Sequence, residues 1–300
     1  MQPDDPQWIL MGVLPQAVAV GVVTLILTLL LGKLMPRKAA AAIVLGVSAA
    51  FVWSWLTILG MPDWPPSTER DWLLVAVLPG AMVIGLLSSL SKIEPVVWIG
   101  RVMLYAVIPY LAVVDSPYLD AESSRGWREA ERALWLGGPA AALLMIRVLM
   151  ALRGRGDTAR HRGLAVGVTG IATGALCLMS EAAGTGQLAI ALGAGLVAAG
   201  VGLLITRSGP IQARLEDVAL PVLGMLMLSG IQFGGVSVRH ALTLTAGLTA
   251  WAALGVIPIL SSLPLIGWLG RWVVMLGLIA WPLAETAIAF SQDQSDDYGY

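Results

Sequence analysis

The chain has 300 residues, of which 57% are hydrophobic and 12% are charged, and its formal net charge is −1. This charged fraction is about half the roughly 25% of a soluble globular protein, and the mean hydropathy of +0.81 indicates a membrane protein. The sequence contains no basic arm or stripe of the kind that nucleic acid requires, so nucleic-acid binding is excluded as a function class.

Apolar runs bounded by charges or turn residues predict ten membrane crossings. A helix needs about 20 mainly apolar residues to cross the hydrocarbon layer, and such runs follow one another almost end to end. The predicted crossings span residues 8–32, 39–60, 72–90, 96–114, 132–151, 163–182, 187–206, 218–236, 241–260 and 271–290. We therefore expect an all-α, polytopic transmembrane helix bundle that forms one integral membrane domain over residues 1–300.

The first crossing follows an acidic segment, MQPDDPQW. A secretory signal peptide has basic residues in this place and a shorter apolar core of about 7–15 residues. We therefore expect the apolar run 8–32 to be retained as a crossing.

The first and third crossings begin with similar stretches. WILMGVLPQAVAVG runs from Trp8 to Gly21, and WLLVAVLPGAMVIG runs from Trp72 to Gly85, 64 residues later. The two share Trp, Leu, Val, Leu, Pro, Ala and Gly at the same positions without a gap. This match predicts a duplicated helix pair with units 8–60 and 72–114, related by an axis along the membrane normal. Chance similarity between two apolar helices is the alternative, and extension beyond residue 115 stays open.

Prolines inside three crossings predict helix kinks. Pro15 and Pro79 each lie seven residues after the Trp of the repeated stretch, about 10 Å along the helix. A proline removes one helix hydrogen bond and bends the helix, so both repeat units should bend at equal depth. Pro282 predicts a further kink in the last crossing.

The distribution of basic residues predicts the orientation. Lys and Arg collect in short cytoplasmic loops. With the N-terminus outside, one side receives 13 of the 18 basic residues and the other receives 5, while most acidic residues lie on the second side. Both termini are therefore expected on the non-cytoplasmic side of a cytoplasmic (inner) membrane, and the preference for Arg over Lys favours a bacterial one.

Two connections have alternative interpretations. The outer loop Asp115–Leu134 is charged and amphipathic, which is typical of a solvated surface segment and also compatible with a recognition site. The stretch Ser261–Gly270 is apolar but rich in Pro and Gly, so it is an interfacial or re-entrant connection or a part of the last crossing.

Three arginines lie inside predicted crossings, near their cytoplasmic ends: Arg101, Arg147 and Arg271. A long arginine side chain can extend along a helix and place its guanidinium among the headgroups. We therefore expect these three arginines to anchor the helices at the cytoplasmic surface.

Ionisable residues near the outer face form a candidate vestibule. Glu181 and Glu285 are expected about one turn below the outer surface, with Asp115, Arg239 and His240 at a comparable depth. Ionisable groups inside a membrane protein are costly and mark candidate functional sites, and these residues could attract a cation or a polar solute. The alternative is that the glutamates are hydrated at the interface or paired with Arg239.

Near the membrane midplane the sequence offers only hydroxyls and amides. Ser229, Gln232 and Thr245 are the main candidates, although such groups more often join helices than bind a ligand. Glycines at a spacing of about four residues in crossings 163–182, 187–206 and 218–236 predict close helix packing, with a sliding interface as the alternative.

The sequence offers no support for common enzyme classes. It contains no HExxH and no G-x-S-x-G motif. The only histidines, His161 and His240, are expected on opposite sides, and the single cysteine, Cys177, lies in an apolar run. We therefore expect no metal and no cofactor, and we do not expect an enzyme.

Two function classes remain. The first is a carrier or permeation protein for a small solute, which kinked helix pairs, Glu181 and Glu285 favour. The second is a structural or assembly subunit of a larger membrane complex, which the small-residue faces and the lack of an evident central polar site favour. Expected partners are membrane lipids and either other membrane subunits or further copies of the chain.

Overall fold

The computed structural model describes residues 6–34, 39–90, 93–114, 116–120, 123, 126–152, 159–180, 182–205, 215–257 and 264–297. Within these ranges the chain is almost entirely helical and has no β-strand. The prediction of an all-α helix bundle is therefore confirmed.

Ten helical rods make up the described part of the chain, and each overlaps one predicted crossing. They are α1 (Pro6–Leu34), α2 (Ala39–Ile58), the continuous rod formed by α3 (Glu69–Trp72), the π-helix η1 (Leu73–Val77) and α4 (Leu78–Leu90), then α5 (Glu94–Leu111), α6 (Glu129–Leu152), α7 (Ala159–Met179), α8 (Ala183–Ile205), α9 (Glu216–Phe233), α10 (Val238–Leu254) and α12 (Pro264–Asp297). Eight helices are long and apolar enough to cross a membrane, while α10 has 17 residues and α1 contributes the shorter stretch Leu14–Leu30. The protein is therefore a multi-pass membrane protein.

The connection before α12 is partly defined. Residues Pro264 to Gly270 belong to α12, whereas 261–263 lie outside the described ranges. The later part of the stretch Ser261–Gly270 is thus an extension of the last helix rather than a separate segment.

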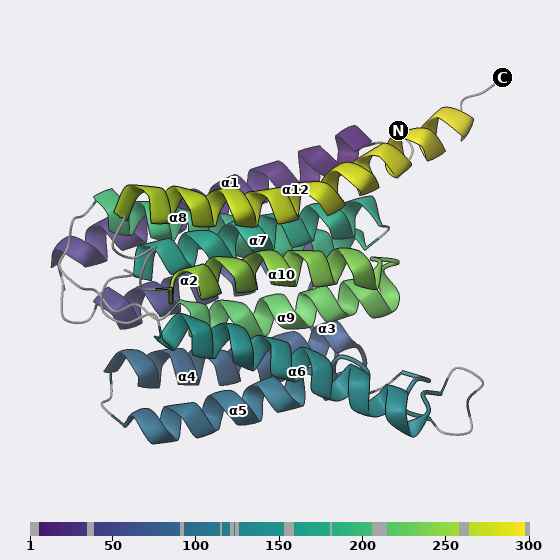
Figure 1. Ribbon diagram of the computed structural model, residues 1–300, viewed down its shortest axis with the longest axis horizontal. Coiled ribbons are helices and arrows are strands. Elements are labelled where there is room, and N and C mark those ends of the chain that lie inside the picture. Colours follow the sequence, from purple (N-terminus) through teal and green to yellow (C-terminus); the bar gives the residue numbers. More distant parts are fainter. Residues whose placement is uncertain are drawn as a thin grey trace.

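The helices that contain the repeated stretches differ at their prolines. Pro15 lies within a regular α-helix, whereas Pro79 follows the π-helical turn η1 directly. A proline cannot donate a backbone hydrogen bond, and a π turn beside it is one way to accommodate the lost bond. Pro282 lies inside α12, which changes direction part-way along its length in Figure 1. The duplication itself stays a prediction.

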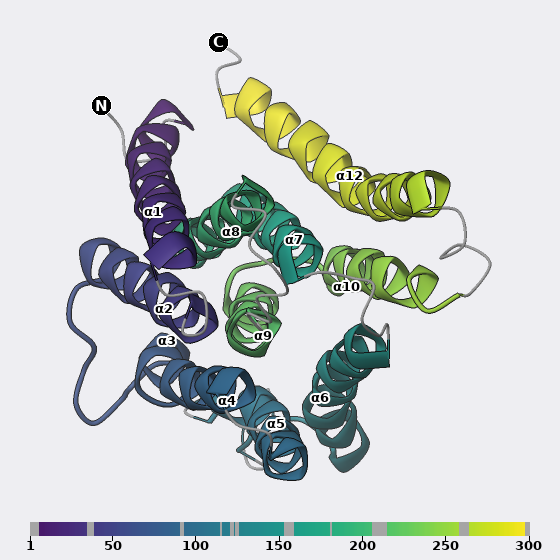
Figure 2. The same cartoon turned by 90° about the vertical axis from the view of Figure 1, so that its left-hand side faces the viewer.

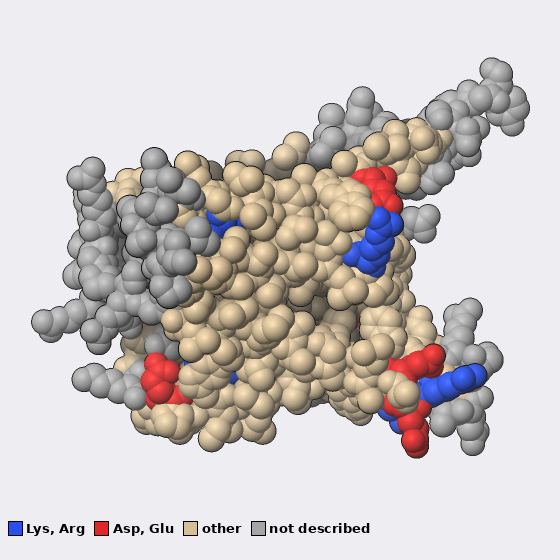
Figure 3. All heavy atoms as spheres, viewed as in Figure 1, with Lys and Arg blue, Asp and Glu red and all other residues tan. Residues whose placement is uncertain are grey.

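Helices that follow one another in the chain run in alternating directions, as Figure 1 shows. Consequently α1 begins and α12 ends at one end of the bundle, which we call the terminal end. Helices α2 and α9 begin at the opposite end, which we call the arginine end because Arg101, Arg147 and Arg162 lie there. Figure 3 shows acidic and basic side chains mainly near the two ends, with a broad belt of other residues between them.

Helix α9 forms the centre of the bundle. In Figure 2 it is encircled by α2, α4, α5, α6, α7, α8 and α10. Of the residues in the apolar 18-residue stretch of α9, 78% are buried inside the bundle. The corresponding share is 17% for α6 and for α12. Side chains on α9 therefore meet other helices, and those on the outer faces of α6 and α12 are left for lipid.

The close packing predicted from the glycines is confirmed for α7 and α8. A Cβ atom added at Gly193 would lie 2.6 Å from the carbonyl oxygen of Gly167, and one added at Gly174 would lie 2.6 Å from that of Gly186. Only glycine leaves room for two helix backbones at this distance. The two helices therefore form a rigid pair beside α9.

Candidate functional site

The first turn of α9 carries two adjacent carboxylates deep in the protein. Glu216 and Asp217 are each 1% exposed, although the next eleven residues of the helix, up to Leu228, are apolar. The N-terminal end of a helix is the positive end of its dipole, which favours negative side chains there. The helix dipole therefore offsets part of the cost of burying both acids.

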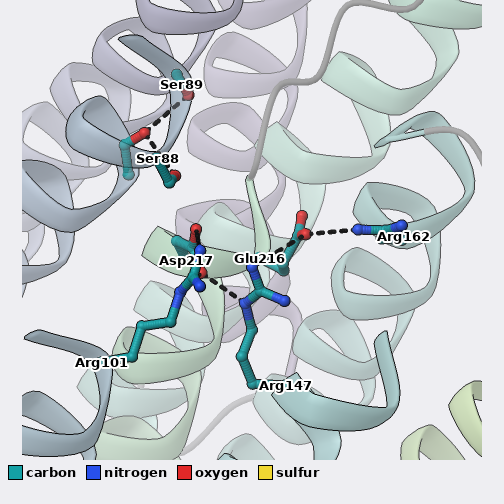
Figure 4. Close-up of polar contacts among 8 residues, drawn as sticks. Ser88, Ser89, Arg101, Arg147, Arg162, Glu216 and Asp217 are labelled. Atoms are coloured by element: carbon teal, nitrogen blue, oxygen red, sulfur yellow. Dashed lines mark hydrogen bonds and ion pairs between the residues drawn. The ribbon is translucent and has the colours of Figure 1, made fainter. Parts of the chain in front are cut away.

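Asp217 binds two arginines from two other helices. Arg101 of α5 donates from Nε to Oδ1 at 2.9 Å and from Nη2 to Oδ2 at 2.7 Å. Arg147 of α6 donates from Nε to the same Oδ1 at 2.6 Å. Figure 4 shows the two side chains converging on Asp217. One carboxylate thereby links α5, α6 and α9.

An indole ring helps to hold the two guanidinium groups close together. The Cζ atom of Arg101 lies 4.7 Å from the centre of a ring of Trp98, and that of Arg147 lies 5.5 Å from it. An aromatic ring attracts a cation through its quadrupole. Trp98 and Asp217 therefore both offset the repulsion between the guanidinium groups of Arg101 and Arg147.

Glu216 extends the network to a third arginine. Its Oε1 accepts a hydrogen bond from Nη1 of Arg162 on α7 at 2.9 Å and lies 4.0 Å from Nη2 of Arg147. The Arg162 side chain is 16% exposed, whereas those of Arg101, Arg147, Glu216 and Asp217 are at most 1% exposed. We call these five residues the arginine–carboxylate cluster, and Arg162 is its link to the surface.

Several buried polar atoms in and beside the cluster lack partners among the described residues. They are Nη1 of Arg101, Nη1 of Arg147, Oε2 of Glu216 and the hydroxyl of Tyr105. A buried donor or acceptor without a partner costs about 1–3 kcal/mol, and more when it is charged. The cluster thus retains unused hydrogen-bonding capacity in a place where such capacity is costly.

The expectation that Arg101 and Arg147 reach the headgroups is wrong. Both residues are 1% exposed and turn inward to Asp217. The reason is that Asp217, in the first turn of α9, lies beside both side chains and accepts their hydrogen bonds. Arg271 on α12 is half-buried, and it is not part of the cluster.

Glu216 and Asp217 are not among the predicted site residues, because the predicted eighth crossing begins at residue 218 and leaves both acids in water. One signal was available. The two acids lie directly before an apolar run, on the side of the protein where basic residues dominate and two crossings contain an arginine. Buried arginines need counterions. The two acids precede a crossing on the same side of the membrane as the helix ends that carry Arg101 and Arg147.

Three of the five predicted vestibule residues meet at the terminal end. Nη1 of Arg239 and Nε2 of His240 each lie 3.5 Å from a carboxylate oxygen of Glu285. Arg239 also lies over the indole of Trp281, with its Cζ atom 4.8 Å from the ring centre. The Glu285 side chain is 43% exposed, so this group joins α10 to α12 at the surface. Glu181 and Asp115 lie outside the described residues.

The predicted midplane residues are distributed along the bundle. Ser229 donates a hydrogen bond from its hydroxyl to Oε1 of Glu69 at 2.9 Å, towards the terminal end. The backbone carbonyl of Gln232, one residue before the end of α9, accepts a bond from the Tyr118 hydroxyl at 3.4 Å. Thr245, midway along α10, donates to the carbonyl of Ala241 in its own helix at 2.8 Å and to Sδ of Met227 on α9 at 3.5 Å. These groups join helices or loops and do not converge on one point.

Aromatic rings cover the terminal end of α9. Trp127, from the predicted outer loop, stacks on Tyr118 with ring centres 5.2 Å apart and on Trp135 with centres 5.7 Å apart. Tyr118 also contacts Phe233, the last residue of α9. The described part of this loop is therefore packed onto the bundle rather than fully solvated.

No group of His, Cys, Asp and Glu within the described ranges could hold a metal ion. Cys177 is a free, buried cysteine. Comparison with known proteins found no family model that matches the chain and no curated protein that matches it in sequence. The arginine–carboxylate cluster is the most concentrated set of buried charges in the described structure, and it is the candidate site.

Proposed function

We propose that the protein is a carrier for a small polar solute, with the arginine–carboxylate cluster as its binding site. The observation that supports this most directly is the burial of the cluster. Four of its charged side chains are at most 1% exposed, and they come from α5, α6 and α9. Charged residues inside a membrane bundle are costly and typically mark a pathway for a substrate or an ion.

The incomplete bonding of the cluster favours a binding site over a structural ion pair. A buried pair offsets its desolvation cost only when the remaining donors and acceptors also find partners. Here one nitrogen of each buried arginine and one oxygen of Glu216 have none within the described structure. Groups that must bind and release a solute are expected to keep such capacity.

The apolar length of α9 favours a carrier over an open pore. Between Asp217 and Ser229 every residue of α9 is apolar, and most of them are buried. Twelve residues of helix correspond to about 18 Å. A polar solute at the cluster would need a change in helix packing to reach the terminal end, which is what a carrier provides.

The orientation belongs to the same proposal. Basic residues favour the cytoplasm, so the arginine end faces inward and both termini face outward in a bacterial inner membrane. A duplicated helix pair, with units 8–60 and 72–114, is one of the repeat arrangements found in transporters. The group of Glu285, Arg239 and His240 then lies at the outer entrance.

The test is solute counterflow in proteoliposomes that contain the purified protein. Vesicles preloaded with unlabelled acetate, phosphate, choline or glycerol are offered the labelled compound. We expect uptake of at least one of them, and its loss in Asp217→Asn. The matched control is Glu129→Gln, a charge removal at an exposed position of α6. Equal uptake with Asp217→Asn and wild type would contradict the assignment of the site.

A structural or assembly role is the second candidate, and the outer faces of the bundle favour it. In the apolar stretches of α6 and α12 only 17% of the residues are buried. Either helix therefore has an apolar face against which another membrane protein could pack. Native mass spectrometry of protein extracted gently from its own membrane separates the two functions. A stoichiometric partner would favour the subunit, and a monomer or homo-oligomer would favour the carrier.

A further inference from the structure

We infer that the arginine–carboxylate cluster recognises an oxyanion, a carboxylate or a phosphate, through the Nη1 atoms of Arg101 and Arg147 and the hydroxyl of Tyr105. This inference rests on the proposed carrier function and names the chemical class of its solute. Two features support it: the Nη1 atoms of Arg101 and Arg147, which have no partner among the described residues, and the buried hydroxyl of Tyr105 on the same helix as Arg101.

Each buried arginine uses only one side of its guanidinium group for Asp217. Arg101 donates through Nε and Nη2, and Arg147 donates through Nε, so Nη1 of each remains without a partner in the described structure. The guanidinium fork fits carboxylate and phosphate oxygens. Both guanidinium groups lie against the ring of Trp98 and donate through Nε to the same Oδ1 of Asp217, so they lie side by side.

Tyr105 supplies a third donor. It lies four residues after Arg101 on α5, a spacing that places two side chains on the same face of a helix. The residue is 1% exposed, and its hydroxyl has no partner among the described residues. Phenylalanine would fill the same space without a buried unpaired hydroxyl. The hydroxyl is therefore best explained by a ligand.

The carboxylates decide where an anion can bind. Asp217 accepts hydrogen bonds from one side of Arg101 and of Arg147, and Glu216 accepts one from Arg162. An anion would therefore bind at the Nη1 atoms of Arg101 and Arg147, which no carboxylate occupies in the described structure. The buried side chains are at most 1% exposed. Entry of an anion therefore requires α5, α6 and α9 to separate, in agreement with a carrier that opens and closes.

The test is a thermal-unfolding titration of the purified full-length protein. One arm adds sodium phosphate or sodium acetate to protein in an uncharged detergent, with sodium chloride at equal ionic strength as the reference. A second arm compares nanodiscs of phosphatidylcholine alone with nanodiscs that also contain phosphatidic acid. The variants are Tyr105→Phe, which removes only the hydroxyl, and Tyr110→Phe on the exposed face of the same helix as control.

We expect one of the oxyanions to raise the Tm of the wild type and of Tyr110→Phe. In Tyr105→Phe the anion concentration needed for the same rise should be about tenfold higher, because one hydrogen bond to a charged group is lost. A merely structural Tyr105 would leave the titration unchanged. Identical titrations of wild type and Tyr105→Phe, or no effect of any oxyanion in either arm, would overturn the inference.

The two arms separate the sources of the anion and the two proposals. A response to the free salts identifies a small solute, and a response only to phosphatidic acid identifies a lipid headgroup. Oxyanion binding without counterflow would retain the site and contradict the carrier. Counterflow of choline or glycerol that phosphate and acetate do not inhibit would retain the carrier and contradict the anion site.

Discussion

Arg101 and Asp217 lie 116 positions apart in the chain and meet through two hydrogen bonds, of 2.9 and 2.7 Å, inside the bundle. Neither side chain is more than 1% exposed. The pair fixes α5 against the start of α9, and Arg147 adds α6 through the same carboxylate. The site that we propose for the solute is therefore also a junction of three helices.

Because Asp217 balances two buried guanidinium groups, we expect Asp217→Asn to destabilise the protein by about 3–5 kcal/mol. The amide keeps the size of the side chain but leaves a buried positive charge without its counterion. The measurement is thermal unfolding in detergent, followed by size-exclusion chromatography. A Tm equal to that of the wild type would show that the arginines find other partners.

A double variant separates charge from packing. Arg101→Met together with Asp217→Leu replaces the ion pair by apolar groups, a change that is often neutral or stabilising in buried sites. Arg147 still needs a counterion in this variant, and Glu216 at 4.0 Å is the nearest one in the structure. We therefore expect the double variant to be more stable than Asp217→Asn. The reverse order would mean that the shape of the junction, rather than its charge, determines stability.

The glycine contact between α7 and α8 gives a third prediction. In Gly193→Ala the new Cβ atom would lie 2.6 Å from the carbonyl oxygen of Gly167 and 2.7 Å from the backbone nitrogen of Ile171. Backbone atoms cannot move aside as a flexible side chain can, so we expect a loss of about 1–3 kcal/mol. Thermal unfolding of the variant in detergent measures the effect.

The matched control for the glycine contact is Gly277→Ala on α12, where an added Cβ atom meets nothing within 4 Å. Alanine favours a helix over glycine by roughly 0.5–1 kcal/mol, so this variant should be unchanged or slightly more stable. If both alanine variants unfolded at the same temperature, close contact of α7 and α8 would not contribute to stability.

The sequence predicted the helices well and the candidate site poorly, for physical reasons. A run of about 20 apolar residues has few alternatives to a membrane helix, so each of the ten predicted crossings corresponds to a helix. The partners of Arg101 depend instead on which helices pack beside α5, and Asp217 lies 116 positions away in the chain. The acids directly before the apolar run 218–228 indicate that a counterion is available, but the local sequence does not say which arginines it meets.

Three residues of the predicted vestibule lie together for a related reason, while the vestibule itself stays a prediction. Arg239 and His240 open α10, and Glu285 lies in the second half of α12. Their meeting requires only that two consecutive helices run antiparallel, a condition that alternating crossings already impose. Contacts between consecutive helices are thus easier to predict than the contact of α5 with α9.

The pair of Glu285 and Arg239 tests whether the terminal end takes part in transport. The two side chains are 43% and 61% exposed and 3.5 Å apart, and exposed pairs contribute at most about 1 kcal/mol. Glu285→Gln should therefore leave the Tm of the protein nearly unchanged.

If the residue lines the outer entrance, the same variant should alter the rate of counterflow, because the charge that the solute meets has changed. Glu129→Gln, also exposed but on α6, should change neither quantity. Unchanged counterflow in Glu285→Gln would restrict the function of this group to the contact between α10 and α12.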